Sequence, residues 1–347
     1  MGGTQIRAAV VQPDGSRLTR TAAETPVEEG PAAVVAACVA RLTATRDSAP
    51  PEVRESIVGV GISSPGPVDP RAGVVVEPPN LGAGFHDVPL ADEVEGALGL
   101  PTFLDRDTNV AALGEAAFGA ARGQPDFIYV TVSTGVGGSI VTDGRLFHGP
   151  DGMAGELGHV PVQLNGPICG CGGRGHLEAI ASGTALAREA REAVEAGTSP
   201  FLSGRARAIG SDELSARDVA AGEDAGDAAC AALMDRARRA IATACVGFVN
   251  AFNPHRIIIG GAIAEAQGER LLGLARATVA RESFSRLAAG VEIVAPELGP
   301  DVSLAGAHPL VSSRLGQPAW RRGGQAQPSL AAPASDMSVH TPGFGRA

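Results

Sequence analysis

Residues 127–142 read FIYVTVSTGVGGSIVT, an apolar run that leads through a glycine-rich turn into a second apolar run. β-Branched and aromatic residues predict a strand over Phe127–Ser133, and Ser139–Thr142 resumes as a strand. The glycines of Thr134–Gly138 allow backbone N–H groups to approach an anion such as phosphate. The same pattern is equally typical of a plain tight hairpin, and the stretch alone does not separate the two interpretations.

On both sides of this hairpin, strand and helix patterns alternate. Strands are predicted at Ile6–Gln12, Ile57–Ile62, Pro101–Asp105 and Arg256–Ile259, with a rigid loop at Ser63–Pro67. Helices are predicted at Pro31–Arg46, Thr108–Ala121, Leu177–Ala196, Ala225–Phe252 and near Leu310. This alternation is typical of the α/β class, and 347 residues suit two domains. Residues 317–347 are rich in Pro, Gln, Gly and Ser and are predicted to be disordered.

Composition narrows the classes of function. The chain has 28 Lys and Arg against 38 Asp and Glu, a formal charge of -10, whereas nucleic-acid binders normally carry a basic patch. No apolar stretch reaches the ~18 uncharged residues of a membrane span. The 5 cysteines and the lack of an export signal argue against a disulfide framework. We therefore expect a cytoplasmic protein without nucleic-acid or membrane partners.

The densest group of potential metal ligands lies in residues 156–178. Glu156-Leu157-Gly158-His159 is followed by Cys169-Gly170-Cys171-Gly172-Gly173-Arg174-Gly175-His176-Leu177-Glu178. Two thiols and two imidazoles on a glycine-rich path form a ligand set that suits four-coordinate Zn²⁺. Four protein ligands make such a site structural. The alternative is a pair of free thiols with two surface histidines.

Two further junctions are compatible with phosphate chemistry. Asp107 follows a predicted strand and precedes a helix, so its carboxylate is either a functional group at the mouth of the helix or an N-cap. Gly260-Gly261 also lies between a strand and a helix, where it either admits a nucleotide or makes a tight turn. Neither motif alone decides between its two interpretations.

Together, and in this order, the motifs resemble the ROK family of bacterial sugar kinases and repressors over residues 2 to 310. The matching segments are Gly2–Thr4, Pro65–Pro67, Asn80–Leu81, Asp87–Leu90, Asp107, Asn109–Glu115, Ser133–Gly138, Glu156–His159, Cys169–Glu178 and Gly260–Gly261. The resemblance implies two actin-like (RNase H-like) ATPase domains around a cleft. The small domain is expected over 1–115 with a final helix near 303–316, and the large domain over 116–298 with the zinc loop at 156–178.

The resemblance also implies roles for individual residues, with Asp107 as the catalytic base. Sugar binding is implied for Asn80, Arg106, Glu156, His159 and Glu178. Phosphate and ATP binding is implied for Gly2, Gly3, Thr4, Ser133, Thr134, Gly135, Gly137, Gly138, Gly260 and Gly261. Zinc binding is implied for His159, Cys169, Cys171 and His176.

Three departures from the family's pattern concern this site. Arg106 stands where the family usually has Asn, which adds a cation near the base. His176 stands where the family has the third cysteine of its zinc loop. The family also has an Asp shortly before its Gly-Gly-Thr motif and a whole strand before that Asp. We therefore predict that a further strand of about ten residues is encoded upstream of Met1; the alternative is that the chain beginning at Met1 folds poorly and is weakly active.

The activity implied by the resemblance is transfer of the γ-phosphate of ATP, with Mg²⁺, to the 6-hydroxyl of glucose beside a structural Zn²⁺. N-Acetylated amino sugars are the alternative substrates. A non-catalytic, sugar-sensing regulator of the same family is the alternative function. The family also implies a homodimer or homotetramer.

Overall fold

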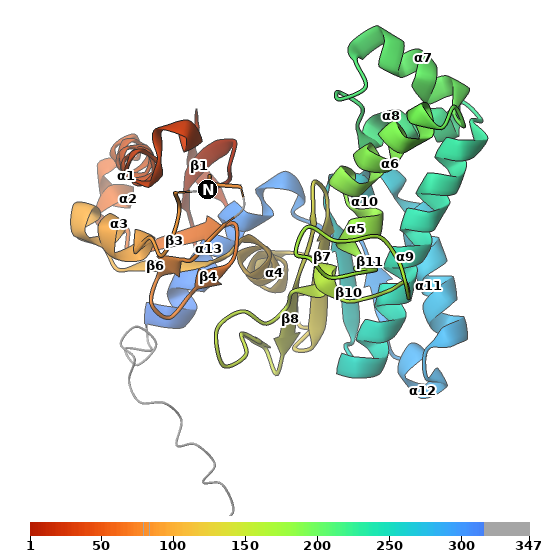
Figure 1. Ribbon diagram of the computed structural model, residues 1–347. Helices are drawn as coiled ribbons and strands as arrows, with labels where there is room; N and C mark the ends of the chain where they lie inside the picture. Colours follow the sequence, from red (N-terminus) through yellow and green to blue (C-terminus); the bar gives the residue numbers. More distant parts are fainter. Residues whose placement is uncertain (79, 83, 316–347) are drawn as a thin grey trace, which may run out of the picture.

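A computed structural model describes residues 1–78, 80–82 and 84–315. The chain forms two lobes that lie side by side, with helix α4 (Asp107–Phe118) between them (Figure 1). The first lobe contains the residues before α4 together with the last helix, α13 (Val302–Leu315), and the second lobe contains residues 127–294. The tail predicted to be disordered, 317–347, lies outside the described residues.

The second lobe is built on one five-stranded sheet in the order β11-β10-β7-β8-β9. Its strands are β7 (Phe127–Val132), β8 (Val136–Thr142), β9 (Arg145–Leu146), β10 (Arg256–Gly260) and β11 (Glu292–Val294). β7, β10 and β11 are parallel, whereas β8 and β9 add antiparallel strands. Alternate residues of β7 enter two different core clusters, Ile128 and Val130 on one face and Phe127 and Tyr129 on the other. The sheet is thus buried on both faces, as its apolar strands require.

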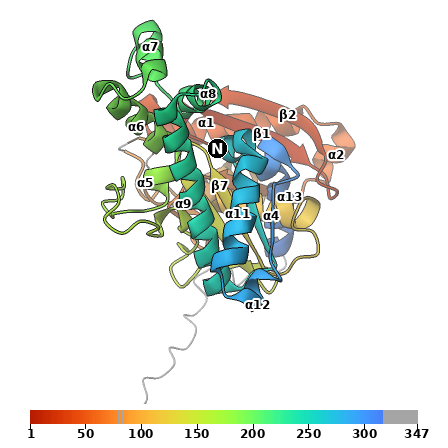
Figure 2. The ribbon, with the colours of Figure 1, turned by 90° about the vertical axis from the view of Figure 1, so that its right-hand side faces the viewer.

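The helices of the second lobe contribute side chains to the core on the face of the sheet that carries Ile128. They are α5 (Glu178–Ala181), α6 (Gly183–Glu195), α7 (Pro200–Ile209), α8 (Ala216–Asp224), α9 (Ala228–Phe252), α10 (Ala262–Gln267), α11 (Glu269–Glu282) and α12 (Ser285–Ala288). The long helices α9 and α11 pack against each other in front of the sheet (Figure 2). Within the described ranges, no helix is both long and apolar enough to cross a bilayer.

The first lobe has several small sheets in place of one large sheet. Its strands are β1 (Gln5–Val11), β2 (Arg17–Glu24), β3 (Val60–Ser64), β4 (Val68–Asp69), β5 (Val74–Val75) and β6 (Thr102–Arg106). Its helices before α4 are α1 (Pro31–Asp47), α2 (Pro51–Glu55) and α3 (Leu90–Leu98). β1 pairs with β2 in an antiparallel hairpin, and β3 pairs with β6 in parallel. Among the described residues, no ladder joins β1 to β3.

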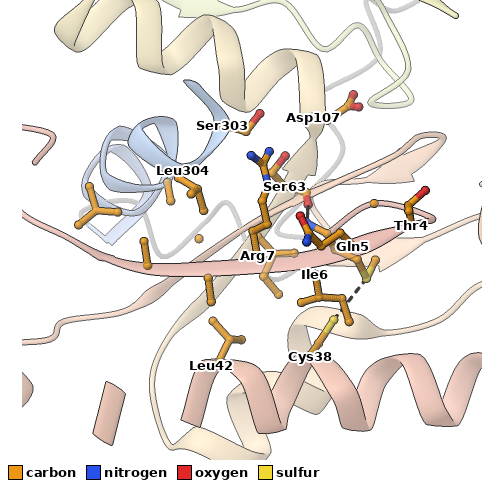
Figure 3. A pocket seen from close by; sticks show the side chains of 18 of the residues that line it. Thr4, Gln5, Ile6, Arg7, Cys38, Leu42, Ser63, Asp107, Ser303 and Leu304 are labelled. Atoms are coloured by element: carbon orange, nitrogen blue, oxygen red, sulfur yellow. Dashed lines mark hydrogen bonds between the residues drawn. The ribbon is translucent and has the colours of Figure 1, made fainter. Parts of the chain in front are cut away.

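A groove with a volume of about 380 Å³ lies between β1 and β3. Residues of β1, β3, α1 and α13 line it, and Asp107 and Thr4 lie at one end, away from Leu42 (Figure 3). The chain at Gly2 already runs back along β1, because the Gly2 N–H donates to the Gln5 carbonyl at 3.0 Å across a two-residue turn. The Met1 ammonium donates to the Ser63 carbonyl of β3 at 2.7 Å. The groove therefore separates two strand edges inside the first lobe.

Glu115 fastens the two places where the chain crosses between the lobes. Its side chain is fully buried on α4 and accepts the N–H groups of Ala120 (2.6 Å), Glu297 (3.2 Å) and Leu298 (3.1 Å). Ala120 lies on the outward crossing from α4 to β7, and the other two residues lie on the return from β11 to α13. A buried carboxylate needs such partners, because an unpaired one costs several kcal/mol.

Most predicted elements are confirmed within a few residues, but two predictions were wrong in detail. Ser63 and Ser64, predicted in a loop, belong to β3, because their parallel pairing with Asp105 and Arg106 extends the strand. The helix predicted over Leu177–Ala196 is divided at Ser182, which has extended backbone and whose hydroxyl caps α6 by accepting the Ala185 N–H. The sequence patterns also missed the helices α2, α3, α7, α8, α11 and α12 and the strands β2, β4, β5, β9 and β11.

Candidate active site

Asp107 is the first residue of α4 and follows β6 directly. Arg106, not Asp107, occupies the N-cap position, so the simple capping interpretation was wrong. The Asp107 carboxylate accepts the N–H of Thr108 at 2.7 Å and keeps an accessible surface at the end of the groove (Figure 3). The positive end of the α4 dipole favours an anion at this position.

Two carboxyl groups two residues apart have opposite pKa shifts. Although its carboxylate remains accessible from the groove, desolvation by the protein around it raises the pKa of Asp107 above its usual value, and the Thr108 N–H and the Arg106 cation oppose this shift. Burial acts on Asp105 in the same direction, but a hydrogen bond from His148 and the charge of Arg314 lower its pKa to about 2. Asp105 is therefore a fixed anion near neutral pH, while Asp107 is the carboxylate better suited to accept a proton.

Asp105 is the centre of a buried network that holds β6 and α4 in place. Its side chain is fully buried and contacts His148 Nε2 at 2.8 Å, Asn109 Nδ2 at 2.8 Å and the Arg314 guanidinium. Asn109 in turn accepts the Ser139 hydroxyl of β8 at 2.7 Å. The network connects both lobes and α13 directly behind Asp107.

Sequence reasoning missed this network. Asp105, His148, Ser139 and Arg314 come from four distant segments, and each is unremarkable in its local pattern. The available signal was a pair of charged residues, Asp105 and Arg106, at the end of a strand that begins with apolar residues. A buried charge in a strand needs partners, but the sequence does not name them.

The predicted glycine hairpin, Ser133–Gly138, lies beside the start of α4. The Gly138 carbonyl accepts the Thr108 hydroxyl at 3.0 Å, and a Cβ on Gly137 would meet the Thr108 methyl at 2.8 Å. A Cβ on Gly138 would meet Leu157 at 2.5 Å. Both residues are thus glycine for packing reasons as well. At the turn, the Thr134 N–H contacts the Ser133 hydroxyl at 2.6 Å, and the Thr134 side chain is exposed.

The structure brings together all four predicted metal ligands. One donor atom from each of His159, Cys169, Cys171 and His176 lies within 4.8 Å of the others. Cys169 Sγ lies 3.6 Å from His159 Nδ1, and Cys171 Sγ lies 3.2 Å from His176 Nδ1. Tetrahedral zinc with bonds of about 2.0–2.3 Å places its donors roughly 3.3–3.8 Å apart, so the two close spacings are near those of a zinc site, and the donor types are those that zinc prefers.

Glu178 connects this metal loop, residues 156–178, to the glycine hairpin. One carboxylate oxygen accepts the Val136 N–H at 3.0 Å, and the other lies 3.8 Å from Cys169 Sγ. A Cβ on Gly135 would meet the Glu178 carboxylate at 2.7 Å, so this glycine makes room for the contact. Glu156 extends the chain of contacts in the other direction, with Oε2 3.8 Å from His159 Nε2 and Oε1 on the Arg106 guanidinium.

The remaining predicted residues occupy three separate places. Gly2, Gly3 and Thr4 line the groove with Asp107, and the Asn80 backbone packs against Gly3, where a Cβ would meet the Asn80 carbonyl at 2.2 Å. Gly261 has φ +92° at the start of α10, and a Cβ there would meet the β7 backbone at 2.5 Å. The Gly260–Gly261 junction is thus packed closely on β7, which does not decide between its two interpretations. The groove contains none of the other predicted site residues.

The sequence pattern of the ROK family matches residues 1–314 of this chain. This chain belongs to the ROK family. Its ROK relatives include the glucokinase of Thermotoga maritima, 37% identical over 317 residues, which cover 91% of this chain and 96% of the relative. The solved ROK hexokinase of Thermus thermophilus superposes with a TM-score of 0.76 at 31% identity, covering 91% of this chain and 97% of that one. A ROK glucokinase of Streptomyces griseus, solved with glucose and AMPPNP, gives a TM-score of 0.71 at 30% identity, with coverage of 88% and 96%. The chain therefore has the mixed α/β ROK sugar kinase fold, which is consistent with an actin-like ATPase.

Proposed function

We propose that this chain is an ATP-dependent glucokinase that phosphorylates the 6-hydroxyl of glucose. The observation that carries the proposal is Asp107, an accessible carboxylate of raised pKa at the start of α4, whose neighbour Thr108 contacts the glycine hairpin. A proton acceptor is thereby placed next to a loop able to approach phosphate. The glucokinase relatives support the same activity.

The chain's contribution to the reaction is a proton acceptor and a rigid frame. The 6-oxygen of glucose attacks the γ-phosphorus and forms a new P–O bond, while the bond to the β,γ-bridging oxygen breaks and ADP leaves. Asp107 accepts the proton of the attacking hydroxyl. Positioning and charge stabilisation supply most of the rate in phosphoryl transfer, so the network behind Asp107 matters as much as the base itself.

The sugar and the nucleotide would be held by different segments. Glu156, His159, Glu178 and Asn80 would bind the sugar hydroxyls, Arg106 would act in the same part of the site, and N-acetylated amino sugars are the alternative substrates. Ser133–Gly138 and Gly2–Thr4 would bind the phosphates, and Gly260–Gly261 would accept the adenosine. ATP would enter as its Mg²⁺ complex, in which the ion neutralises part of the phosphate charge.

The metal loop would hold a structural Zn²⁺. Its donor set of two thiols and two imidazoles suits this ion, and the donor spacings are tetrahedral in scale. When bound, the ion supplies a four-point cross-link of residues 159–176. His159 would ligate through Nδ1, so its Nε2, which faces Glu156, remains available to a sugar hydroxyl.

The two lobes would be the two actin-like domains, 1–115 with the final helix and 116–298. Residue 316 of that predicted helix lies outside the described residues. The homodimer or homotetramer and the cytoplasmic location remain predictions from the family resemblance.

A coupled assay of ADP formation over a panel of hexoses tests the proposal. We expect turnover with ATP and glucose, and a lower kcat/KM with N-acetylmannosamine and N-acetylglucosamine. Faster turnover of an N-acetylated sugar would assign the chain to that substrate class. If no sugar on the panel yields ADP although calorimetry detects glucose binding, the chain is a sugar-sensing protein and not a kinase.

A further inference from the structure

The Arg106 guanidinium is held on nearly every side by protein. Its Nε–H donates to the Thr108 hydroxyl at 3.0 Å, and one terminal nitrogen donates to the carbonyls of Gly138 (2.8 Å) and Ala154 (3.0 Å). The other terminal nitrogen donates to Glu156 Oε1. Arg106 ends β6 of the first lobe, whereas Gly138, Ala154 and Glu156 belong to the second lobe. One side chain thus connects β6 to the second lobe through three acceptors, while its fourth acceptor lies on α4.

The surroundings of Arg106 are shaped to fit this side chain. A Cβ on Gly66 would meet Arg106 Cδ at 2.9 Å, and a Cβ on Gly155 would meet a terminal guanidinium nitrogen at 2.7 Å. Gly155 also has φ +91°, a conformation that L side chains rarely adopt. The Arg106 side chain is 10% exposed, so this cation is desolvated and depends on its partners.

Burial makes the Arg106–Glu156 pair asymmetric. The Glu156 side chain is 51% exposed, five times as much as that of Arg106. Carboxylate Oε1 is bound to the guanidinium, and Oε2 is left toward His159. Because Oε1 already accepts from the guanidinium, a sugar hydroxyl can use only Oε2, whose direction is fixed by that contact.

We propose that Arg106 is a positioning residue that orients the Glu156 carboxylate toward the sugar and thereby sets the affinity for glucose. The inference rests on the proposed glucokinase activity and gives Arg106 a different role from direct sugar binding. The planar guanidinium satisfies four acceptors in fixed directions, which the single ammonium of lysine cannot do. Charge and orientation are therefore separable by substitution.

The test compares Arg106→Lys with the parent in steady-state kinetics. We expect KM for glucose to rise about ten-fold, with KM for ATP within two-fold, because glucose alone depends on Glu156. Arg239→Lys, at an exposed pair with Asp235, is the matched control and should change neither constant. An unchanged KM for glucose, or an equal rise for both substrates, overturns the proposal.

A double-mutant cycle with Glu156→Gln separates positioning from direct contact. If Arg106 acts through Glu156, Arg106→Lys has little further effect on KM for glucose in the Glu156→Gln background. Additive effects contradict the inference and return Arg106 to direct sugar binding. Should Arg106→Lys not fold, Thr108→Val removes a single acceptor of the guanidinium and should raise KM for glucose in the same selective way. Absence of turnover in the parent would instead reject the glucokinase proposal.

Discussion

The strands of the two lobes differ in how completely they are paired. In the second lobe, five strands form one continuous sheet that is packed on both faces. In the first lobe, β1-β2 and β3-β6 remain separate pairs on either side of a groove. Isolated strand pairs are marginally stable, whereas larger sheets with a buried face support themselves. The strands of the second lobe therefore stabilise one another in a single sheet, whereas the strand pairs of the first lobe are stabilised by packing on helices and by polar contacts.

Those polar contacts are concentrated behind Asp107. The Asp105 network and the Arg106 guanidinium join the β6–α4 junction to the second lobe and to α13. Glu115 connects the other end of α4 to the chain crossings. The proposed base would thus lie at the junction of the lobes and be held in place by buried polar groups. Four experiments test this difference, in order of decreasing effect.

Asp107→Asn tests whether the carboxylate at the start of α4, between the lobes, is the base. An amide keeps the shape of the side chain but cannot accept the proton, so kcat should fall by ~10²-fold or more while glucose still binds. Single-turnover kinetics and calorimetry measure the two quantities. Asp235→Asn, on the exposed surface of α9, should leave both unchanged. A kcat within a few-fold of the parent removes Asp107 from the role.

Cys169→Ser tests whether the second lobe owes part of its order to a metal. We expect loss of bound zinc by elemental analysis, together with a rise of at least about ten-fold in KM for glucose, because the ligands anchor the loop that carries Glu156 and His159. Cys230→Ala, in the buried core of the lobe, should retain the metal. Freshly purified parent protein without zinc would contradict the proposed site.

Joining an apolar strand before Met1 tests whether the groove is what weakens the first lobe. The Gly2–Gln5 turn directs such a segment along the free edge of β1 and toward β3. Pairing on both edges should raise Tm by roughly 5 °C or more and should increase turnover. An extension of equal length made of Gly and Ser is the control. Equal Tm values for the two extended forms in scanning calorimetry would show that the groove does not accept a strand.

Asp105→Asn tests the polar connection behind the base. The pKa of Asp105 is lowered from 3.8 to about 2 in the folded protein, so its ionised form stabilises the fold above pH 3.8, and this stability is lost as the pH falls through 2. The shift corresponds to about 2 kcal/mol. In urea unfolding, the free energy of unfolding of the parent should be higher than that of Asp105→Asn at pH 7. The difference between the two free energies should be smaller at pH 3. A difference that does not change with pH would indicate another cause.

The site was predictable to the extent that its chemistry is local in sequence. Cys169, Cys171 and His176 lie within eight residues, and the glycines between them already indicated a tight loop around an ion. The position of Asp107 between a strand and a helix was predictable for the same reason. The division of the helix at Ser182 was not, because helical periodicity continues on both sides of a single extended residue.

The sequence by itself determined the α/β class, the order of most elements, the family resemblance and the four potential metal ligands, because each depends on short-range pattern. Only the tertiary structure decided what the buried charges do. Arg106 shows this most clearly: its position suggested a cation near the base and the sugar, but the fold surrounds its guanidinium with acceptors from both lobes. When a long charged side chain is buried, protein groups must replace its hydrating water, and these partners decide what the side chain does. In this fold the partners come from distant parts of the chain, so the sequence pattern does not identify them.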